Sequence, residues 1–587
     1  MNFNLLPNEI LLAFFDYLNG NDLLHTFYGL NARINAFLYK QYQCYYFKFS
    51  VLSKRNFDII YQQHIPLISD DILALHLSDS DSNPGQSNLL FYYSPSLRQF
   101  THLRSLSLSH LRSKEILLKV SIELSYLVQL THLKFCVCYI PDYNETDFEL
   151  LTSNIWNLPN LTYCYFDIRN KRPQSFVIPS KITSSLKYLS IMTEKIKLNS
   201  INRLFQCTPY LKYLRARIDC LEHNDDYIGS SFSTLTNLHI FIMASHPSKI
   251  ISFLRNIPNL HRLNIRIATC YFINGHQWED LIRNYLPKLR TFHLSMIDLT
   301  IDPLMTEERI NELMNSFRTS FWIDERRWFV RYMSKKYFIR FGTVSKAFDF
   351  IGDTLPSVFK STDSQDSIEK LYTTMSRISD VTLANQSIAS KICFPKLNSL
   401  SVKCPINDQY WSMISNLHQV SSLSLHLSTD FSQSELQAFL DRMPHLRTLI
   451  IHQDASLPFP MAIFNCTFPS IHYLHLENCK HYFNEEDCTI LSHSSLTSQC
   501  KQLDILVKNR QSIIILINKM TNLCALRARF TDEKIFEYEP SRMRHNVTDE
   551  TILCKDEDIQ WMIDQLPSTC IITRHPLCIN HIRIWLK

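Results

Sequence analysis

Glycine is scarce in this chain of 587 residues, which contains seven glycines, the closest pair being Gly20 and Gly29. The phosphate-binding motifs G-x-G-x-x-G and G-x-x-x-x-G-K-[ST] therefore cannot occur. The metalloprotease motif H-E-x-x-H and the hydrolase motif G-x-S-x-G are also missing. These absences exclude several large enzyme classes. We find no convergent catalytic site, and we expect a non-enzymatic protein without a cofactor or metal.

Long hydrophobic runs are missing from the N-terminal region, although Leu5 to Leu38 is rich in large apolar side chains. Its longest uninterrupted apolar run, Ile10 to Phe15, has six residues. A secretory signal needs a longer apolar run behind a basic start, and a membrane helix needs about 20 apolar residues. We therefore expect that this stretch neither targets the chain for secretion nor spans a membrane.

Cysteine pairs and blocks of like charge are missing as well. The 17 cysteines are scattered, and none forms a C-x-x-C pair. Many such cysteines without a signal peptide are typical of a reducing compartment, so we expect a cytoplasmic or nuclear protein. The net charge of +5 is too small over this length to indicate nucleic-acid binding by itself. Neither nucleic acid nor a membrane is an expected partner.

A repeated apolar pattern, in contrast, runs through most of the chain. Its frame places apolar residues at positions 0, +3 and +5, as at Leu103, Leu106 and Leu108. In the first half the frame returns at Leu130/Leu133/Phe135, Leu161/Cys164/Phe166, Leu186/Leu189/Ile191, Leu211/Leu214/Ala216, Leu238/Phe241/Met243, Leu260/Leu263/Ile265 and Leu289/Phe292/Leu294. In the second half it returns from Leu397, Val420, Leu446 and Ile471. Weaker copies begin at Ile72 before the first half's series and at Ile378, Leu503 and Leu523 in the second half.

Each copy predicts one strand and one returning helix. The +3/+5 pair is typical of a short strand that buries alternate residues. A strand plus a helix about every 20–29 residues is the leucine-rich-repeat unit, and stacked units form a curved solenoid with parallel strands on its concave face. Cys138 and Cys479 follow the strands where such repeats often carry Asn or Cys. We interpret them as ladder residues and not as metal ligands.

The pattern divides the chain into segments and predicts an α/β fold. One interruption contains two alternating runs, Arg327 to Tyr332 and Tyr337 to Phe341, which predict a β-hairpin. The interruption is either a degenerate repeat packed on the solenoid or a partner-binding excursion. The predicted segments are an N-terminal helical module at 1–48, repeats at 60–299, an irregular insertion at 300–375, repeats at 376–530 and a C-terminal cap at 531–587.

The N-terminal module resembles the F-box, a short three-helix family. The resemblance covers roughly residues 2–45. It rests on Leu6-Pro7-x-Glu9-Ile10-Leu11, on Phe15 and Leu18, and on Asp22-Leu23-Leu24 followed by Phe27. The family often ends in Cys-x-x-Trp, whereas this chain has Phe37 near that point. F-box modules followed by leucine-rich repeats are a familiar combination.

The resemblance implies a substrate receptor of an SCF-type ubiquitin ligase. The F-box would bind the Skp-type adaptor of a cullin–RING ligase, and the repeats would hold a protein substrate. Independently, some forty residues cannot bury two apolar stripes by themselves, which indicates a docking partner. The alternatives are that these helices merely cap the first repeat and that the chain is a repeat scaffold without a ligase. The expected adaptor contacts are Leu6, Pro7, Ile10, Leu11, Phe15, Leu18, Leu23, Leu24 and Phe27.

A substrate surface is expected on the concave side of the repeats. Positions +2, +4 and +6 of the frame point out of the strands there. Tyr and Arg, which are enriched in binding hot spots, gather at these positions in adjacent repeats. The hypothesis is an acidic or phosphorylated protein segment as ligand; the alternative is an ordinary solvated strand face. The residues are Tyr163, Tyr165, Tyr188, Tyr213, Arg215, Arg217, Arg262 and Arg266.

Overall fold

The computed structural model describes residues 6–50, 52–141, 143–170, 175–219, 231–243, 246–269, 271–298, 306–335, 338–344, 358–367, 376–378, 396–404, 417–428, 432–453, 457–467, 471–530, 550–575 and 581–586. Within these ranges no helix is both long and apolar enough to cross a lipid bilayer. Short strands alternate with helices along the chain, so the fold is a mixed α/β repeat array.

Three short helices precede the first strand: α1 (Asn8–Phe15), α2 (Gly20–Phe27) and α3 (Ala32–Ala36), the last of which continues into a π-helical turn at Phe37–Gln41. The side-chain oxygens of Asn19 and Asn31 begin α2 and α3 by accepting hydrogen bonds from the backbone N–H groups of Asp22 (3.1 Å) and Ile34 (2.8 Å). Asparagine is favoured at this position because it satisfies an N–H group that lacks a partner within the helix.

A 13-stranded sheet occupies the first part of the array, and its strands β1 to β10 follow one another in chain order. Neighbouring strands in this run are parallel, because a returning segment separates each strand from the next. These strands are β1 (Tyr45–Lys48), β2 (Ile72–Ser78), β3 (Ser105–Ser109), β4 (His132–Tyr139), β5 (Tyr163–Arg169), β6 (Tyr188–Lys197), β7 (Tyr213–Asp219), β8 (Asn237–Met243), β9 (Arg262–Ala268) and β10 (Thr291–Asp298).

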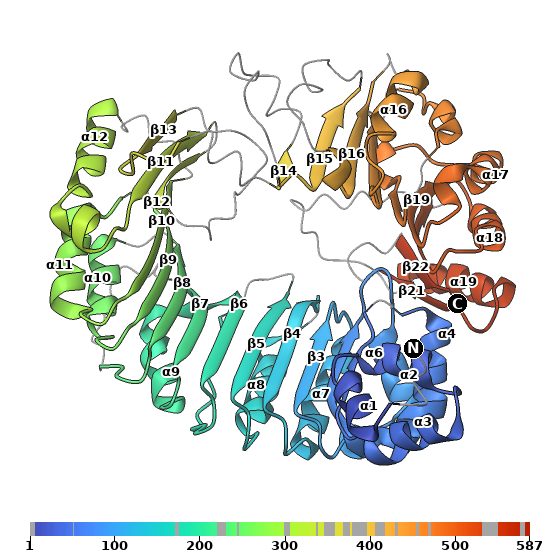
Figure 1. Ribbon diagram of the computed structural model, residues 1–587, viewed down its shortest axis with the longest axis horizontal. Helices are drawn as coiled ribbons and strands as arrows, with labels where there is room; N and C mark the ends of the chain where they lie inside the picture. Colours follow the sequence, from blue (N-terminus) through green and yellow to red (C-terminus); the bar gives the residue numbers. More distant parts are fainter. Residues whose placement is uncertain are drawn as a thin grey trace.

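Helices cover the outer side of this sheet, and the strands line the inner side (Figure 1). Along β7 and β8, buried residues alternate with half-buried ones, as expected for strands with one face on a core. The helices of this part are α4 (Lys54–Ile59), α5 (Ile65–Ile68), α6 (Gln86–Tyr93), α7 (Lys114–Glu123), α8 (Glu145–Trp156), α9 (Ile201–Cys207), α10 (Pro247–Arg255), α11 (Gly275–Tyr285) and α12 (Glu307–Ser316).

Three antiparallel strands end the first sheet. The alternating runs predicted to form a hairpin are β11 (Val330–Lys335) and β12 (Phe338–Thr343), which pair antiparallel. β12 also pairs with β10, and β11 pairs with β13 (Val358–Ser361). The segment at 300–375 was expected to be an irregular insertion. Its described strands instead extend the first sheet, because β12 pairs with the edge of β10.

A second, nine-stranded sheet continues the array, and its last two strands are antiparallel. Its strands in chain order are β14 (Arg377–Ile378), β15 (Ser399–Lys403), β16 (Ser422–Leu427), β17 (Thr448–Gln453), β18 (Tyr473–His475), β19 (Gln502–Val507), β20 (Ala525–Phe530), β21 (Ile571–Arg574) and β22 (His581–Trp585). The helices are α16 (Gln433–Leu440), α17 (Glu485–His493), α18 (Arg510–Lys519) and α19 (Glu550–Gln565). The expected C-terminal cap corresponds to α19, β21 and β22.

The two sheets curve toward each other and form an almost complete ring (Figure 1). Each sheet has its own cluster of buried apolar side chains on the helix side. Leu133 and Leu449, for example, are fully buried in the first and second clusters. The C-terminal strands return to the beginning of the first sheet, where Trp585 of β22 belongs to the first cluster.

The strand register confirms most of the predicted frame and corrects it at three copies, those from Leu238, Leu503 and Ile378. Leu214 of β7 pairs with Leu238, so Leu238 occupies the +3 position, and Leu235 is the first anchor. Phe241 and Met243 therefore face the inner side, although both were assigned to the core. Leu503 and Ile378 likewise pair with +3 residues of neighbouring repeats, and Val381 and Leu383 lie outside the described residues.

Gly342 allows β12 to approach β10 closely. A Cβ atom at this position would lie 2.2 Å from the backbone oxygen of Leu294. Because backbone atoms cannot move aside cheaply, we expect Gly342→Ala to lower the free energy of unfolding by about 1–3 kcal/mol, measured by urea denaturation. The control is Gly29→Ala. The backbone φ of Gly29 is +84°, but an added Cβ atom would have no neighbour within 4 Å, so this variant reports backbone strain without a steric clash. Equal losses in the two variants would contradict the close approach.

Candidate functional site

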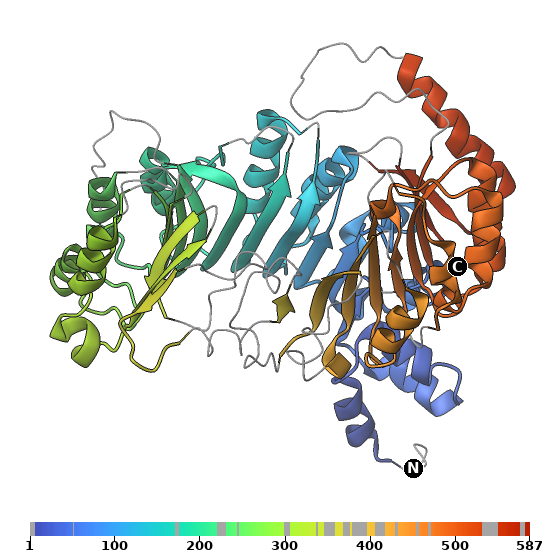
Figure 2. The same ribbon diagram turned by 90° about the horizontal axis from the view of Figure 1, so that it is seen from above.

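An exposed apolar face on α1 is the first candidate surface. Ile10, Phe14 and Tyr17 are 53%, 42% and 88% exposed, and Pro7 is exposed as well. Spacings of three and four residues place these side chains on one side of the helix. We call Pro7, Ile10, Phe14 and Tyr17 the α1 face. The helix, dark blue in Figure 2, projects from the ring away from both sheets.

The predicted adaptor contacts divide into two groups. Pro7 and Ile10 are exposed, and Leu6 and Leu18 are half-buried. The other five residues are at most 3% exposed, so they support the fold and offer no surface to a partner in this conformation; they are Leu11, Phe15, Leu23, Leu24 and Phe27. The sequence pattern could not distinguish the groups, because it does not show that β1 and the first repeat cover α2. Phe14 and Tyr17 are exposed residues that the prediction missed.

The chain's own core holds α1 in place. The Phe15 ring packs against Phe27 and Tyr42, with centroid distances of 5.2 and 5.8 Å. Arg33 of α3 donates hydrogen bonds from its guanidinium to the backbone oxygen of Leu6 and to the side-chain oxygen of Asn8, both at 2.6 Å. The α1 face is therefore presented on a fixed helix.

A row of stacked aromatic rings lies on the inner side of the first sheet. His132, Tyr163, Tyr188 and Tyr213 are register partners on strands β4 to β7. Their ring centroids are separated by 5.5, 6.2 and 5.9 Å along the row. We call these four residues the aromatic row. The rings are aligned because the parallel strands pair at these positions without a register shift.

A group of basic side chains continues from the aromatic row across β7 to β9. Arg215 pairs in register with His239, and Arg217 with Phe241, whose next partner is Arg266. The guanidinium carbon of Arg217 lies 5.3 Å from the Phe241 ring centroid, within cation–π range. We call the group of Arg215, Arg217, His239, Arg262 and Arg266 the basic cluster.

Within the described ranges, the positive charge of the basic cluster has no acidic partner. Among the residues that the structure describes, no ion pair is found for Arg215, Arg217, Arg262 or Arg266. The acidic groups nearest in register are paired elsewhere: Asp219 with Lys195 at 3.3 Å and Asp167 with Arg169 at 3.5 Å. Neighbouring strands are about 4.8 Å apart, so the like charges lie within a Debye length of one another. An acidic ligand would relieve their repulsion.

The environment of the cluster changes the pKa of its histidine. Burial, with smaller contributions from neighbouring positive groups such as Arg215 and Arg266, lowers the pKa of His239 to about 4. Burial also lowers the pKa of His293. Both imidazoles are therefore neutral at pH 7, when each ring can accept as well as donate a hydrogen bond.

All eight predicted substrate residues lie on the inner side, on strands β5, β6, β7 and β9. Tyr163, Tyr188 and Tyr213 belong to the aromatic row, and Tyr165 extends it in the next register row. The prediction missed His239 and Phe241. The frame chosen for that repeat assigned Phe241 to the core, and the correct signal would have been Leu235 followed by Leu238 and Ile240.

The inner side of the second sheet carries a pair of stacked histidines on β16 and β17. His426 and His452 are register partners whose rings stack at 4.3 Å, and Ser401 lies 3.2 Å from His426. Cys138 and Cys479 are ladder residues as predicted: each is buried and donates its S–H to the preceding repeat, to the backbone oxygens of Leu108 (3.5 Å) and Ile451 (3.2 Å). No group of three His, Cys, Asp or Glu side chains suited to a metal ion occurs in the described part of the chain.

Comparisons with known proteins add little to this geometry. No protein-family model matches the sequence, and no curated protein matches it significantly. Similar solved structures include a TLR13–ssRNA13 complex (15% identity, 77% of this chain and 49% of that chain, TM-score 0.17). Another is PEPR1–AtPEP1 (13% identity, 84% of this chain and 65% of that chain, TM-score 0.17). The chain spans less than two thirds of either protein. Scores this low carry no argument, so the repeat architecture rests on the strand register itself.

The lowered pKa of His239 makes the folded state sensitive to acid. In the unfolded chain this histidine titrates near pH 6.5, whereas in the folded state it stays neutral down to about pH 4. Between these values the unfolded state binds an additional proton, so stability falls as the pH falls. We expect His239→Gln to reduce the loss in urea midpoint between pH 7 and pH 5. An unchanged pH dependence would contradict the assigned burial.

Proposed function

We propose that this chain is the substrate-recognition subunit of an SCF-type cullin–RING ubiquitin ligase. In this role the N-terminal helices bind a Skp-type adaptor, and the inner side of the repeats binds a protein substrate. The observation that carries the proposal is the exposed α1 face, which lies within the F-box-like sequence and projects from the ring (Figure 2). The protein would act in the cytoplasm or the nucleus.

Exposure of the α1 face supports a docking role. Large apolar side chains at a helix surface cost free energy in water, roughly 25 cal/mol for each Å². Contiguous apolar patches on a folded protein commonly mark interaction sites. The α1 face is held rigidly by Phe15 and Arg33, so little conformational entropy is lost when a partner covers it. These properties fit a stable subunit contact.

The basic cluster and the aromatic row support an acidic protein segment as the substrate element. Arginine binds carboxylate and phosphate groups through paired hydrogen bonds, and tyrosine offers a large rigid contact area. Both kinds of side chain lie next to each other on β5 to β9, where the sheet is concave. A segment lying across these strands could contact the two surfaces at once.

In this role the chain would promote ubiquitin transfer by holding the substrate close to the ubiquitin-loaded partner. We assign no chemical step to this chain: the adaptor brings the ubiquitin-loaded partner, and the repeats hold the substrate beside it. Tethering raises the effective concentration of the substrate's lysines to the millimolar range typical of short linkers. The alternative proposal is a protein-binding scaffold without a ligase, in which α1 to α3 only cap the first repeat. It differs in having no adaptor contact.

Introducing negative charge on the α1 face by mutation tests whether this face binds the adaptor. We expect Ile10→Glu combined with Phe14→Glu to weaken binding of a purified Skp-type adaptor by about 30-fold or more, because both apolar contacts would be replaced by desolvated carboxylates. Isothermal titration calorimetry on the full chain measures the loss. Ile122→Glu on α7 is the matched control, since Ile122 is 56% exposed and Ile10 is 53% exposed. Unchanged affinity in the double variant, or absence of binding by the parent, favours the scaffold.

Charge reversal in the basic cluster tests the substrate surface. We expect Arg215→Glu, Arg217→Glu and Arg262→Glu together to weaken binding of a fluorescent poly-glutamate peptide by about 10-fold or more, measured by anisotropy at low salt. Arg255→Glu is the control, because Arg255 is an exposed arginine on α10, on the helix side of the sheet. Equal losses in the two proteins would show a non-specific charge effect and would contradict the assignment.

A further inference from the structure

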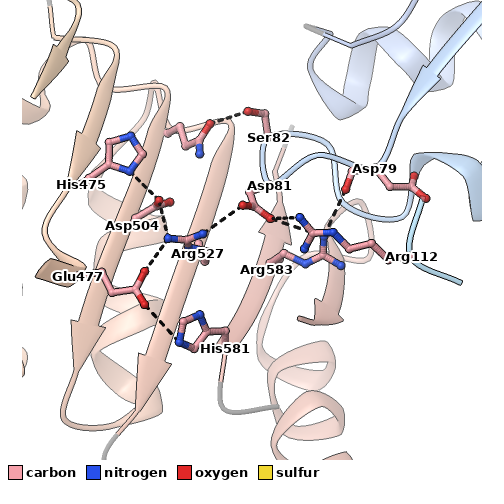
Figure 3. Close-up of polar contacts among 11 residues, drawn as sticks. Asp79, Asp81, Ser82, Arg112, His475, Glu477, Asp504, Arg527, His581 and Arg583 are labelled. Carbon is pink, nitrogen blue, oxygen red and sulfur yellow. Dashed lines mark hydrogen bonds and ion pairs between the residues drawn. The ribbon is translucent and has the colours of Figure 1, made fainter. Parts of the chain in front are cut away.

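The ring closes at a seam where the loop after β2 meets the last strands of the chain. Figure 3 shows this seam, with Asp79, Asp81 and Ser82 on one side and Arg527 and Arg583 on the other. Asp81 and Arg527 are 446 positions apart in the sequence. The hydroxyl group of Ser82 also donates a hydrogen bond to the side-chain oxygen of Gln502, at 2.5 Å.

Asp81 is the acidic centre of the seam. Its carboxylate lies 3.1 Å from the guanidinium of Arg112 in the first part of the ring, 3.1 Å from that of Arg527 and 3.7 Å from that of Arg583. Burial raises the pKa of this carboxyl, but the three guanidinium groups outweigh burial and hold the pKa below its ordinary value. Asp81 is therefore ionised at neutral pH and joins cations from both ends of the array.

The network continues into the second sheet, which fixes its cationic side. Arg527 of β20 also pairs with Glu477 (2.5 Å) and Asp504 (3.1 Å). Asp504 contacts His475 at 2.7 Å, and Glu477 lies 3.3 Å from His581. Arg527, one of the cations that meet Asp81, is thus held in position by neighbouring acids. Among the contacts described, two groups of the first part of the ring reach Arg527 and Arg583. One is the Asp81 carboxylate, and the other is the backbone oxygen of Asp79, which accepts a hydrogen bond from Arg583 at 3.3 Å.

An apolar contact accompanies the charges, and Trp585, which makes it, is fully buried. Trp585 of β22 packs on Phe57 of α4, with ring centroids 5.6 Å apart. A Cβ atom on Gly85, at a backbone φ of +75°, would lie 3.2 Å from the Ile571 side chain. Trp585 and the partly buried Ile571 pack with the first apolar core, whereas the buried core of the second sheet forms a separate cluster.

We propose that this seam is a latch, at which the ring opens reversibly while both sheets stay folded. Two separate cores joined by a mostly polar contact behave as two bodies, and polar contacts between bodies within one chain permit relative motion. Ion pairs with partial exposure lose less free energy on separation than an apolar interface does, because water solvates the separated charges. Opening at the seam would widen access to the inner side of both sheets. The inference does not depend on the proposed function.

The test removes the acidic centre and measures the shape of the full chain. We expect Asp81→Asn to shift the closed-to-open equilibrium about 10-fold or more toward the open ring, because three guanidinium groups lose their shared anion. Small-angle X-ray scattering should show a larger radius of gyration and maximum dimension than in the parent. Hydrogen exchange should accelerate in peptides covering residues 79–86 and 581–586. Circular dichroism should remain unchanged.

A second variant and a matched control make the test decisive. Arg583→Gln removes a cation from the opposite side of the seam and should open the ring in the same way. Asp219→Asn breaks an ion pair within the first sheet at equal exposure, 22% for Asp219 and 23% for Asp81, and should keep the parental scattering. Unchanged scattering and exchange in both seam variants would contradict a latch held by charge. Loss of helix and strand content in Asp81→Asn would also overturn it, since the seam would then belong to a single cooperative fold.

Discussion

The alignment of buried residues across parallel strands is the constraint on which the rest of this structure depends. Leu106, Leu133 and Cys164 occupy one register row, and each is buried between the sheet and the helices. A slip of one residue in any repeat would turn its apolar side chains to the inner side. The same alignment fixes the inner rows, so the tyrosines that stack and the arginines that gather do so because the core residues between them cannot shift.

Two surfaces follow from this arrangement, and they differ in chemistry and shape. The α1 face is apolar, convex and held by the first core, which suits a permanent protein contact. The aromatic row and the basic cluster are polar, concave and built on strands, which suits recognition of an acidic segment. The seam at Asp81 joins the first repeat, next to the N-terminal helices, to the end of the second sheet that completes the ring.

Much of the fold could be predicted from the sequence, because the repeat frame is local. Leucines at fixed spacing identified most strands, and the alternation from Arg327 to Phe341 identified the hairpin. The frame failed at Leu238, where the apolar Phe241 and Met243 imitate core positions although they face inward. Burial of Leu23 and Leu24 depends on β1 and the first repeat. The pairing of Asp81 with Arg527 depends on the curvature of the entire array, which no local pattern encodes.

Hydrogen exchange of the full chain with and without a purified Skp-type adaptor tests the separation of the two surfaces most directly. The prediction is a complex in which peptides covering residues 6–18 become protected, while peptides covering β5 to β9 exchange as in the free chain. The inner side would then stay open to a substrate. Absence of a complex, or protection confined to the inner strands, would contradict the assignment of the α1 face as the docking surface.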